Sequence, residues 1–400
     1  MKNILHRFAR ALVFNQLRKI KTGHITIMEG PKKFSFGKKG KLSVTLTVRD
    51  PRFYGALAFG GSIGVSEAFI QKFWTVSDLT KLIRIMAINQ NTMDRLEGLF
   101  NLFLKPLLKY LHYLNQNSVK GSQVNISKHY DLGNDFFSLF LDSTMMYSSA
   151  VFRGPHDSLY KGSIHKLETI CQGLELTSQD HIIEIGSGWG GFAIYAAQNF
   201  GCKVTTTTIS KEQYKYVRQK IKDLKLSHKI TILLSDYRHL KGQYDKLVSI
   251  EMLEAVGYQY YDTYFNVCSQ LLKPDGLAFI QTITIADQRY EKSKRSVDFI
   301  QRYIFPGSCI PSITAIQNSI SKSSDLKIYG IQDIGEHYAR TLALWRESFF
   351  KKLKEVKALG FDDAFIRMWH FYLSYCEGGF KEKVISDIHL KLIKPGYRTK

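Results

Sequence analysis

The sequence lacks the marks of several protein classes. Its five cysteines are scattered and none form a CxxC pair, which argues against a zinc ribbon or disulfide scaffold and favours a reducing compartment. We find no apolar run as long as a membrane span, no solenoid repeat and no clean secretory signal in the first 21 residues. With 44% hydrophobic and 23% charged residues over 400 positions, the chain should fold as two domains or as one extended domain.

Acidic residues are scarce in the first third of the chain. Residues 1–120 hold 20 Lys and Arg against 6 Asp and Glu, a net charge of +14 out of +21 for the whole chain. Such a segment prefers a polyanion, either nucleic acid or an anionic membrane surface, although a solvated face has the same composition. We expect residues 1–22 to form a basic amphipathic helix. Its apolar side would carry Leu5, Phe8, Leu12 and Leu17.

The rest of this third mixes short strands with helices. Alternating runs predict strands at 24–28 and 41–48, with 32–40 as the basic turn between them. Helical periodicity follows over 77–114, where the apolar, lysine-dotted end could lie on a bilayer or dock on the remaining protein. Residues 114–125 have linker composition. We therefore predict a basic α+β domain over 1–120 and a second domain over 121–400.

Beyond the linker, strand and helix patterns alternate. Five apolar, β-rich runs are separated by helical stretches, which predicts an α/β fold with a parallel, doubly wound sheet. The five runs are 181–188, 202–209, 229–236, 244–252 and 277–285.

A glycine loop joins the first of these runs to a helix. Gly186, Gly188 and Gly190 would let the chain turn tightly and let a ligand approach the backbone. Glu184 precedes the loop, and the next strand ends in the neutral residues TTTTIS rather than the acid that holds a ribose in NAD enzymes. These two details favour a methyltransferase cofactor over a dinucleotide.

Nine motifs occur in the order and spacing of the cyclopropane fatty acid synthases, and from about residue 125 to 392 the chain resembles that family. They are HYDLGNDFFSLFLD (129–142), MMYSSAVF (145–152), IGSGWGG (185–191), TISKEQ (208–213), EMLEAVG (251–257), YDTYF (261–265), LLKPDG (271–276), DFIQRYIFPG (298–307) and RMWHFYLSYCEGGF (367–380). The resemblance implies a Rossmann-like, seven-stranded methyltransferase fold. It also implies that S-adenosylmethionine supplies a methylene group across a cis double bond of an acyl chain in a phospholipid, giving a cyclopropane ring.

Carried over by position, the resemblance also implies site residues. The cofactor would contact Tyr147, Ser148, Glu184, Gly186, Gly188, Gly190, Thr208, Ser210, Gln213, Asp236 and Tyr237. No metal is expected. In this family a bound bicarbonate ion is the base that removes the last proton.

The implied bicarbonate pocket is only partly matched. Glu254, the Ile283 main chain and Tyr338 agree with the family pattern, whereas Ser149 and Gln281 replace Cys and His. Both replacements still donate hydrogen bonds to an oxyanion. A further acid, Glu251, is expected to be a supporting or helix-capping residue.

Aromatic faces stabilise a substrate cation by ~0.5–2 kcal/mol each. Single aromatic residues are nevertheless more often core than catalytic, and a lone His129 is more often structural. The candidates are Phe136, Phe137, Tyr264, Phe265, Tyr303, Phe305 and Tyr338.

Alternatives remain open. The same chemistry could give methylene- or methyl-branched chains, and a lipid-binding protein without activity could use the same scaffold. A nucleic-acid methyltransferase is disfavoured because EMLEAVG stands where such enzymes carry their catalytic loop. The expected partner is unsaturated phospholipid in an anionic membrane, with no nucleic acid. A homodimer is suggested by the resemblance alone. The expected location is cytoplasmic, at the inner membrane face.

Overall fold

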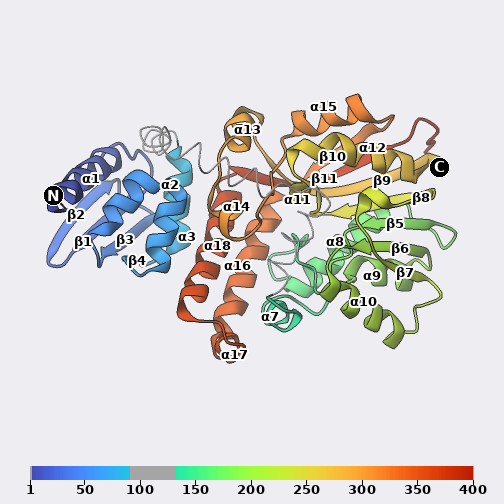
Figure 1. The fold of residues 1–400 in the computed structure, drawn as a ribbon, viewed down its shortest axis with the longest axis horizontal. Coiled ribbons are helices and arrows are strands. Elements are labelled where there is room, and N and C mark those ends of the chain that lie inside the picture. The colour runs from blue at the N-terminus through green and yellow to red at the C-terminus, as the bar shows by residue number, and fades with distance from the viewer. Residues whose placement is uncertain (1, 91–131, 400) are drawn as a thin grey trace. The chain divides into compact units, whose positions relative to one another are not determined.

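The computed structural model describes residues 2–90 and 132–399. These residues form two compact units, drawn in Figure 1. The first unit combines the N-terminal part of the chain with Ser296–Ile304 and Leu353–Val384, and the second contains the remaining described residues. The predicted boundary at 120/121 lies outside the described residues and stays a prediction.

The first unit is built on a four-stranded sheet in the order β2-β1-β3-β4. Its strands are β1 (His24–Glu29), β2 (Lys32–Gly37), β3 (Ser43–Val48) and β4 (Trp74–Val76). Its helices are α1 (Lys2–Leu17), α2 (Arg52–Ile70), α3 (Leu79–Ile88), α14 (Phe299–Tyr303), α17 (Leu353–Ala358) and α18 (Asp363–Lys381). The predicted strands at 24–28 and 41–48 are confirmed. The predicted basic turn is wrong, because residues 32–37 form a strand that pairs antiparallel with β1.

The predicted apolar face of the first helix is confirmed at Leu17 and wrong at Phe8. Phe8 is 57% exposed, whereas Ala9, Val13, Phe14 and Leu17 are buried. The Arg10 guanidinium lies over the Phe14 ring at 4.2 Å and pairs with Glu29 at 2.7 Å, so a charged residue on this inner side is neutralised locally. The helix therefore turns its apolar side into its own unit.

Helix α2 corrects another expectation. By length and composition it could cross a membrane, so one apolar segment does reach the required length. However, Gly61 breaks the helical geometry inside it, with φ 54° and ψ −140°, and its buried side chains include Phe53, Tyr54 and Phe69. Within the described residues, 39% of its most apolar window is buried, so the helix packs into its own unit along part of its surface.

The second unit contains a seven-stranded sheet in the order β10-β11-β9-β8-β5-β6-β7. Its strands are β5 (His181–Ile185), β6 (Lys203–Thr208), β7 (Ile230–Leu234), β8 (Tyr244–Ile250), β9 (Leu272–Ile285), β10 (Lys327–Asp333) and β11 (Ile385–Ile393). The five predicted runs form β5 to β9, which are mutually parallel. β11 lies antiparallel between β9 and β10.

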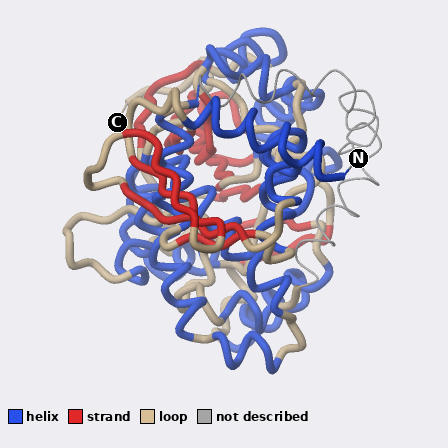
Figure 2. Tube along the Cα trace, turned by 90° about the vertical axis from the view of Figure 1, so that its left-hand side faces the viewer, coloured by secondary structure: helices blue, strands red, loops and turns tan. Residues whose placement is uncertain are grey.

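Helices cover both faces of this sheet, as Figures 1 and 2 show. Along β5, Ile182 belongs to a core cluster with α8, α9 and α10, and Ile183 belongs to a second cluster with α12 and α15. This alternation follows from the two-residue period of a strand. The helical segments of the unit are α7 (Asn134–Ser138), α8 (Leu159–Gly173), α9 (Gly191–Asn199), α10 (Lys211–Asp223), η1 (Tyr237–His239), α11 (Leu253–Val256), η2 (Tyr258–Tyr260), α12 (Tyr261–Leu271), α13 (Asp287–Lys294), α15 (Ile313–Ser323) and α16 (Gly335–Lys351).

Candidate active site

The glycine loop leaves the carboxyl end of β5, near the middle of the seven-stranded sheet. Gly190 caps α9 in a left-handed conformation, with φ 85°. A Cβ added to Gly188, whose φ is 49°, would meet no atom within 4 Å. A Cβ added to Gly186 would lie 3.1 Å from Met252, so the loop borders the EMLEAVG motif. The loop therefore presents its backbone to open space beside that acidic motif.

Glu184 lies one residue before the end of β5 and is 2% exposed. Burial in this apolar strand raises the pKa of its carboxyl to about 8. Its Oε2 has no hydrogen-bond partner among the described residues. An acceptor left without a donor beside a glycine loop suits the ribose hydroxyls of a nucleoside cofactor, so these residues fit S-adenosylmethionine.

Other predicted cofactor residues are held by their neighbours. The Thr208 hydroxyl donates to Gln213 Oε1 at 2.8 Å, and Ser210 caps α10 by accepting from the Gln213 N–H at 3.3 Å. These three side chains form one buried cluster at the end of β6. The structure thus brings them together and gives them a helix-capping role.

The next predicted pair, Asp236 and Tyr237, lies just after the end of β7. Asp236 binds Arg238 through both carboxylate oxygens, at 2.8 and 2.7 Å. Burial opposes ionisation, but the Arg238 hydrogen bonds outweigh it and lower the Asp236 pKa. The buried Tyr237 hydroxyl has no partner among the described residues, which leaves it available to a ligand.

Tyr147 and Ser148 lie on the segment before α8. The Tyr147 ring packs 5.1 Å from Phe137 and 5.2 Å from Trp345, within an aromatic group. The Ser148 hydroxyl accepts from the buried Lys166 ammonium at 2.5 Å. Burial lowers the Lys166 pKa to about 8.

The aromatic candidates of the sequence separate between the two units. Tyr303 belongs to the first unit, where its hydroxyl donates to Glu67. In the second unit, Phe136, Phe137, Tyr264 and Phe265 are fully buried and make ring contacts typical of a core. His129 lies outside the described residues.

A cluster of carboxyl groups follows β8, in which Glu251 is half-buried and Glu254 is buried. Glu251 Oε1 accepts from the Ser149 N–H at 2.7 Å and from the Gln281 amide at 2.9 Å. Its Oε2 accepts from the Tyr338 hydroxyl at 2.5 Å. Glu251 thus has direct bonds to predicted site residues on three separate segments. It is more central than the supporting role predicted for it.

Glu254 lies one helical turn further, in α11. Its Oε1 accepts from the Ile283 N–H on β9, and its Oε2 has no partner among the described residues. Burial and the nearby charge of Glu251 raise the Glu254 pKa to about 8. The predicted set of Ser149, Glu254, Gln281, Ile283 and Tyr338 is therefore assembled around the two glutamates.

Two further residues of this cluster were missed from the sequence. Asp387 faces Ile283 across the β9–β11 pairing and accepts from the Gln281 amide at 2.7 Å. Lys166 is fully buried in α8. An acid inside the apolar run of β11 was a signal for Asp387. No feature of the sequence marked Lys166, because a lysine in a helix is normally solvated.

The implied bicarbonate ion does not fit these residues. Its expected donors are the Ser149 segment, Gln281, Ile283 and Tyr338, and each of them already binds a carboxylate of the chain. Among the described residues, no group of three or more His, Cys, Asp or Glu could hold a metal ion.

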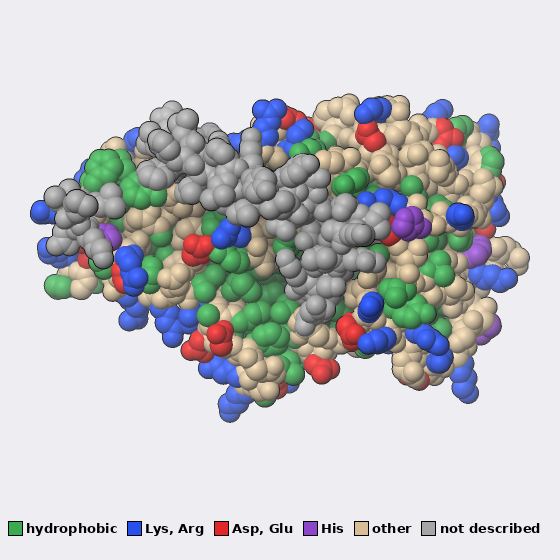
Figure 3. Space-filling view, in the orientation of Figure 1, with side chains coloured by type: hydrophobic (Ala, Val, Ile, Leu, Met, Phe, Trp, Pro, Cys, Tyr) green, Lys and Arg blue, Asp and Glu red, His purple; other side chains and the backbone are tan. Residues whose placement is uncertain are grey.

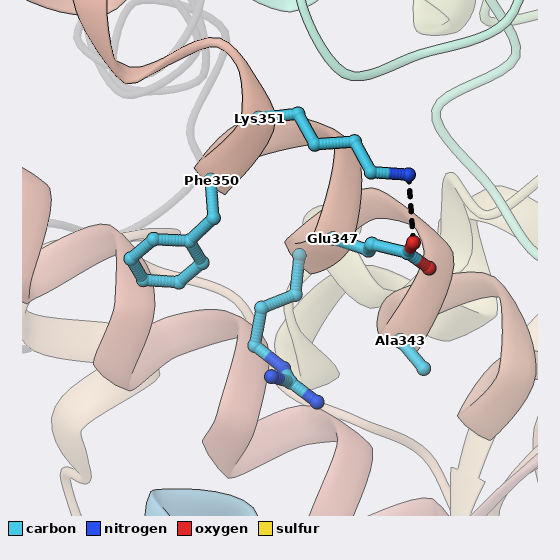
Figure 4. A pocket seen from close by; sticks show the side chains of 5 residues that line it. Ala343, Glu347, Phe350 and Lys351 are labelled. Carbon is cyan, nitrogen blue, oxygen red and sulfur yellow. Dashed lines mark ion pairs between the residues drawn. The ribbon is translucent and has the colours of Figure 1, made fainter.

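A separate hollow of about 610 Å³ lies along α16, shown in Figure 4. It is lined by Ala343, Arg346, Glu347, Phe350 and Lys351. Glu347 and Lys351, one turn apart on α16, form an exposed ion pair of 2.7 Å in its lining. None of the predicted site residues lines this hollow.

Comparison with known proteins identifies the family. The sequence profile of the mycolic acid cyclopropane synthetases matches residues 117–390. The chain belongs to this family. It is therefore an S-adenosylmethionine-dependent methyltransferase, and the predicted enzyme class and fold are confirmed.

Relatives cover most of the chain. It is 35% identical over 344 residues to tuberculostearic acid methyltransferase UfaA1 of Mycobacterium tuberculosis, spanning 84% of this chain and 80% of that protein. It is 34% identical over 349 residues to the cyclopropane-fatty-acyl-phospholipid synthase of Escherichia coli, spanning 86% and 87%. The solved structure of mycolic acid cyclopropane synthase CmaA1 with SAH and CTAB superposes with a TM-score of 0.64 at 29% identity, covering 68% of this chain and 98% of that one.

Proposed function

We propose that this family member methylates a cis double bond in an acyl chain of membrane phospholipid and closes a cyclopropane ring. When bound, S-adenosylmethionine supplies an electrophilic methyl group. The observation that carries the proposal is the cluster of the half-buried Glu251 with the buried Glu254 and Asp387, beside the glycine loop. An alkene has no proton to lose before methylation, so the reaction needs a base only at its end, in a dry site.

The cluster also speaks against a lipid-binding protein without activity. Three buried carboxyl oxygens, on Glu184, Glu254 and Asp387, have no partner among the described residues. Each unpartnered buried polar group costs about 1–3 kcal/mol. A scaffold that only bound lipid would gain nothing from this cost, whereas a cofactor and a proton-transfer step use such groups.

A second product class shares this machinery. If a hydride first shifts from the methylated carbon to the cationic carbon beside it, loss of a proton from the transferred methyl gives a methylene-branched chain. The similarity to UfaA1 makes branching the alternative to test. A saturated methyl branch needs two further electrons and a proton from a reductant. Cyclopropane and methylene products need none.

The direct test is a lipid assay. The purified chain is incubated with methyl-labelled S-adenosylmethionine and anionic vesicles of a cis-monounsaturated phospholipid, and the acyl chains are analysed by mass spectrometry. A gain of one CH₂ with loss of the original double bond is expected, whereas a methylene-branched product of the same mass would keep one double bond. Vesicles of saturated phospholipid are the control. Labelled water-soluble product with no labelled lipid would contradict the proposal.

The site of action would be a membrane surface. Exposed lysines cluster on and after β2, at Lys32, Lys33, Lys38, Lys39 and Lys41. Figure 3 shows blue Lys and Arg side chains along the first unit. Lysines near an anionic surface contribute about 1 kcal/mol each, which supports peripheral binding to such a membrane.

A further inference from the structure

The Glu251 carboxylate occupies the place predicted for a small anion. The three hydrogen bonds that it accepts come from Ser149, Gln281 and Tyr338 and measure 2.7, 2.9 and 2.5 Å. These are donors expected of an oxyanion pocket. A carboxylate and a bicarbonate ion each carry one negative charge on a planar CO₂ group, and bicarbonate has a hydroxyl in addition.

The backbone at Glu251 is strained. Its φ is 49°, in the left-handed region that residues with a Cβ rarely adopt. Such a conformation costs of the order of 1–3 kcal/mol and persists where the surroundings hold it, often at functional sites. Glycine would adopt this φ without strain. The side chain of Glu251 is thus held here by what its carboxylate binds.

From this geometry we propose that the Glu251 carboxylate replaces a bound bicarbonate ion as the general base of the reaction. This inference rests on the proposed function. In the last step a C–H bond of the transferred methyl breaks, and its electron pair forms the third carbon–carbon bond of the ring. The proton passes to Glu251 Oε2. That oxygen accepts from the Tyr338 hydroxyl, whereas Oε1 accepts from both the Ser149 N–H and the Gln281 amide.

The groups around Glu251 favour its ionised form. Burial raises the pKa of all three carboxyl groups, but on Glu251 the hydrogen bonds from Tyr338 and Ser149 act against this effect, whereas the charge of Glu251 raises the pKa of Asp387 and Glu254 further. We therefore place the negative charge of the cluster on Glu251. Lys166, fully buried in α8, adds an attractive charge. The His389 ring on β11 stays neutral, because burial lowers its pKa to about 3.

Activity in the absence of bicarbonate is the first arm of the test. In carbon-dioxide-free buffer, the full-length chain should form product at the rate seen with added bicarbonate, to within about twofold. Glu251→Gln should slow product formation by roughly 10²–10⁴-fold, the usual worth of a positioned base. Glu168→Gln, a change at a partly exposed glutamate paired with Arg153, should leave the rate unchanged.

Chemical rescue separates a base from a structural residue. Glu251→Gly relieves the strain at φ 49° and leaves the three donors without an acceptor. Added bicarbonate or formate should therefore raise the rate of this variant at least tenfold over its rate without the anion. Glu251→Gln should not be rescued, since its amide fills the same space. Failure of both anions to rescue a folded Glu251→Gly variant would overturn the proposal.

A binding measurement makes the result independent of turnover. Carbon-13 bicarbonate followed by NMR should show no binding to the unaltered chain and saturable binding to Glu251→Gly. Saturable binding to the unaltered chain, or loss of its activity without bicarbonate, would overturn the proposal. If the unaltered chain binds cofactor but methylates no lipid, the proposed function fails, and the NMR arm still decides whether Glu251 fills the anion pocket.

Discussion

At the residue scale, the site is dominated by carboxyl groups buried without enough donors. Glu184 shows the effect in isolation: it is 2% exposed, and its Oε2 has no partner among the described residues. A nucleoside cofactor with two ribose hydroxyls would supply the missing donors. We therefore expect Glu184 to strengthen cofactor binding and to lower the stability of the cofactor-free protein.

Glu184→Gln tests that opposition. The folded-state pKa of about 8 lies above the usual 4.5, so the folded protein binds the proton more tightly than the unfolded chain does. Its contribution to stability is full below pH 4.5 and is lost as the pH rises through 8. Glutamine does not titrate, so the variant does not lose stability over this pH range. Its melting temperature without cofactor should exceed that of the unaltered chain by a margin that grows from pH 5 to pH 8.

The same variant should bind S-adenosylmethionine about 10–100-fold more weakly, the worth of a hydrogen bond to a charged group. Isothermal titration calorimetry measures this, with Glu168→Gln as the matched glutamate control. An unchanged affinity would remove Glu184 from the cofactor site.

At the scale of elements, the loop after β5 and the helix α18 depend on glycine for different reasons. The loop needs backbone freedom and an uncovered surface at Gly188. In α18, Gly378 is needed because a Cβ there would lie 2.6 Å from Ile83 Cγ2 on α3. α18 is further joined to α3 by the Thr80–Glu377 hydrogen bond of 3.1 Å.

Gly188→Val should abolish detectable cofactor binding, because the side chain enters the open space in front of the loop. Backbone strain is controlled with Gly30→Val, since Gly30 has φ 55° and also meets no atom within 4 Å of an added Cβ. Calorimetry on folded samples is the measurement. Equal affinity in the two variants would argue that Gly188 does not border the cofactor.

Gly378→Ala should destabilise the chain by about 1–3 kcal/mol, the range found for overpacked cores. Alanine is otherwise the better helix former by roughly 1 kcal/mol, so the sign of the effect reports the α3–α18 contact. Gly55→Ala in α2, where an added Cβ meets nothing, should be neutral or stabilising. Urea unfolding of both variants measures the difference, and a stabilising Gly378→Ala would contradict the close contact.

At the scale of the whole molecule, the first unit concentrates positive charge and draws on chain segments far apart in sequence. Removing the N-terminal third would also remove the helices that pack against α18. A truncated chain could then lose membrane binding either because it lacks the positive charge or because it is misfolded. Changing exposed lysines avoids this difficulty.

Replacing Lys32, Lys33, Lys38 and Lys39 with glutamate should weaken binding to anionic vesicles at least tenfold, with the largest difference at low salt. Vesicle sedimentation from 50 to 300 mM salt measures the effect, and cofactor affinity should stay unchanged. Four exposed lysines of the second unit, Lys203, Lys211, Lys215 and Lys241, provide the matched control. Equal loss in both variants would mean that general charge, not the first unit, drives binding.

The sequence by itself determined the family, the parallel strands β5 to β9 and the glycine loop that follows β5. These follow from local patterns, since strand periodicity, a glycine loop and ordered motifs are readable along the chain. It did not determine β10 and β11, the strand β2 or the buried side of α1, because each depends on which surface a segment meets.

Only the tertiary structure decided the electrostatics of the site. The sequence shows Glu251, Glu254 and Asp387 as three acids up to 136 positions apart and Lys166 as an ordinary helical lysine. Folding buries Lys166, Glu254 and Asp387 and half-buries Glu251. It thereby shifts their pKa values, since desolvation and neighbouring charge depend on what surrounds a group in space. Which carboxylate binds the donors from Ser149, Gln281 and Tyr338 is likewise a matter of geometry, fixed by the left-handed turn at the end of β8.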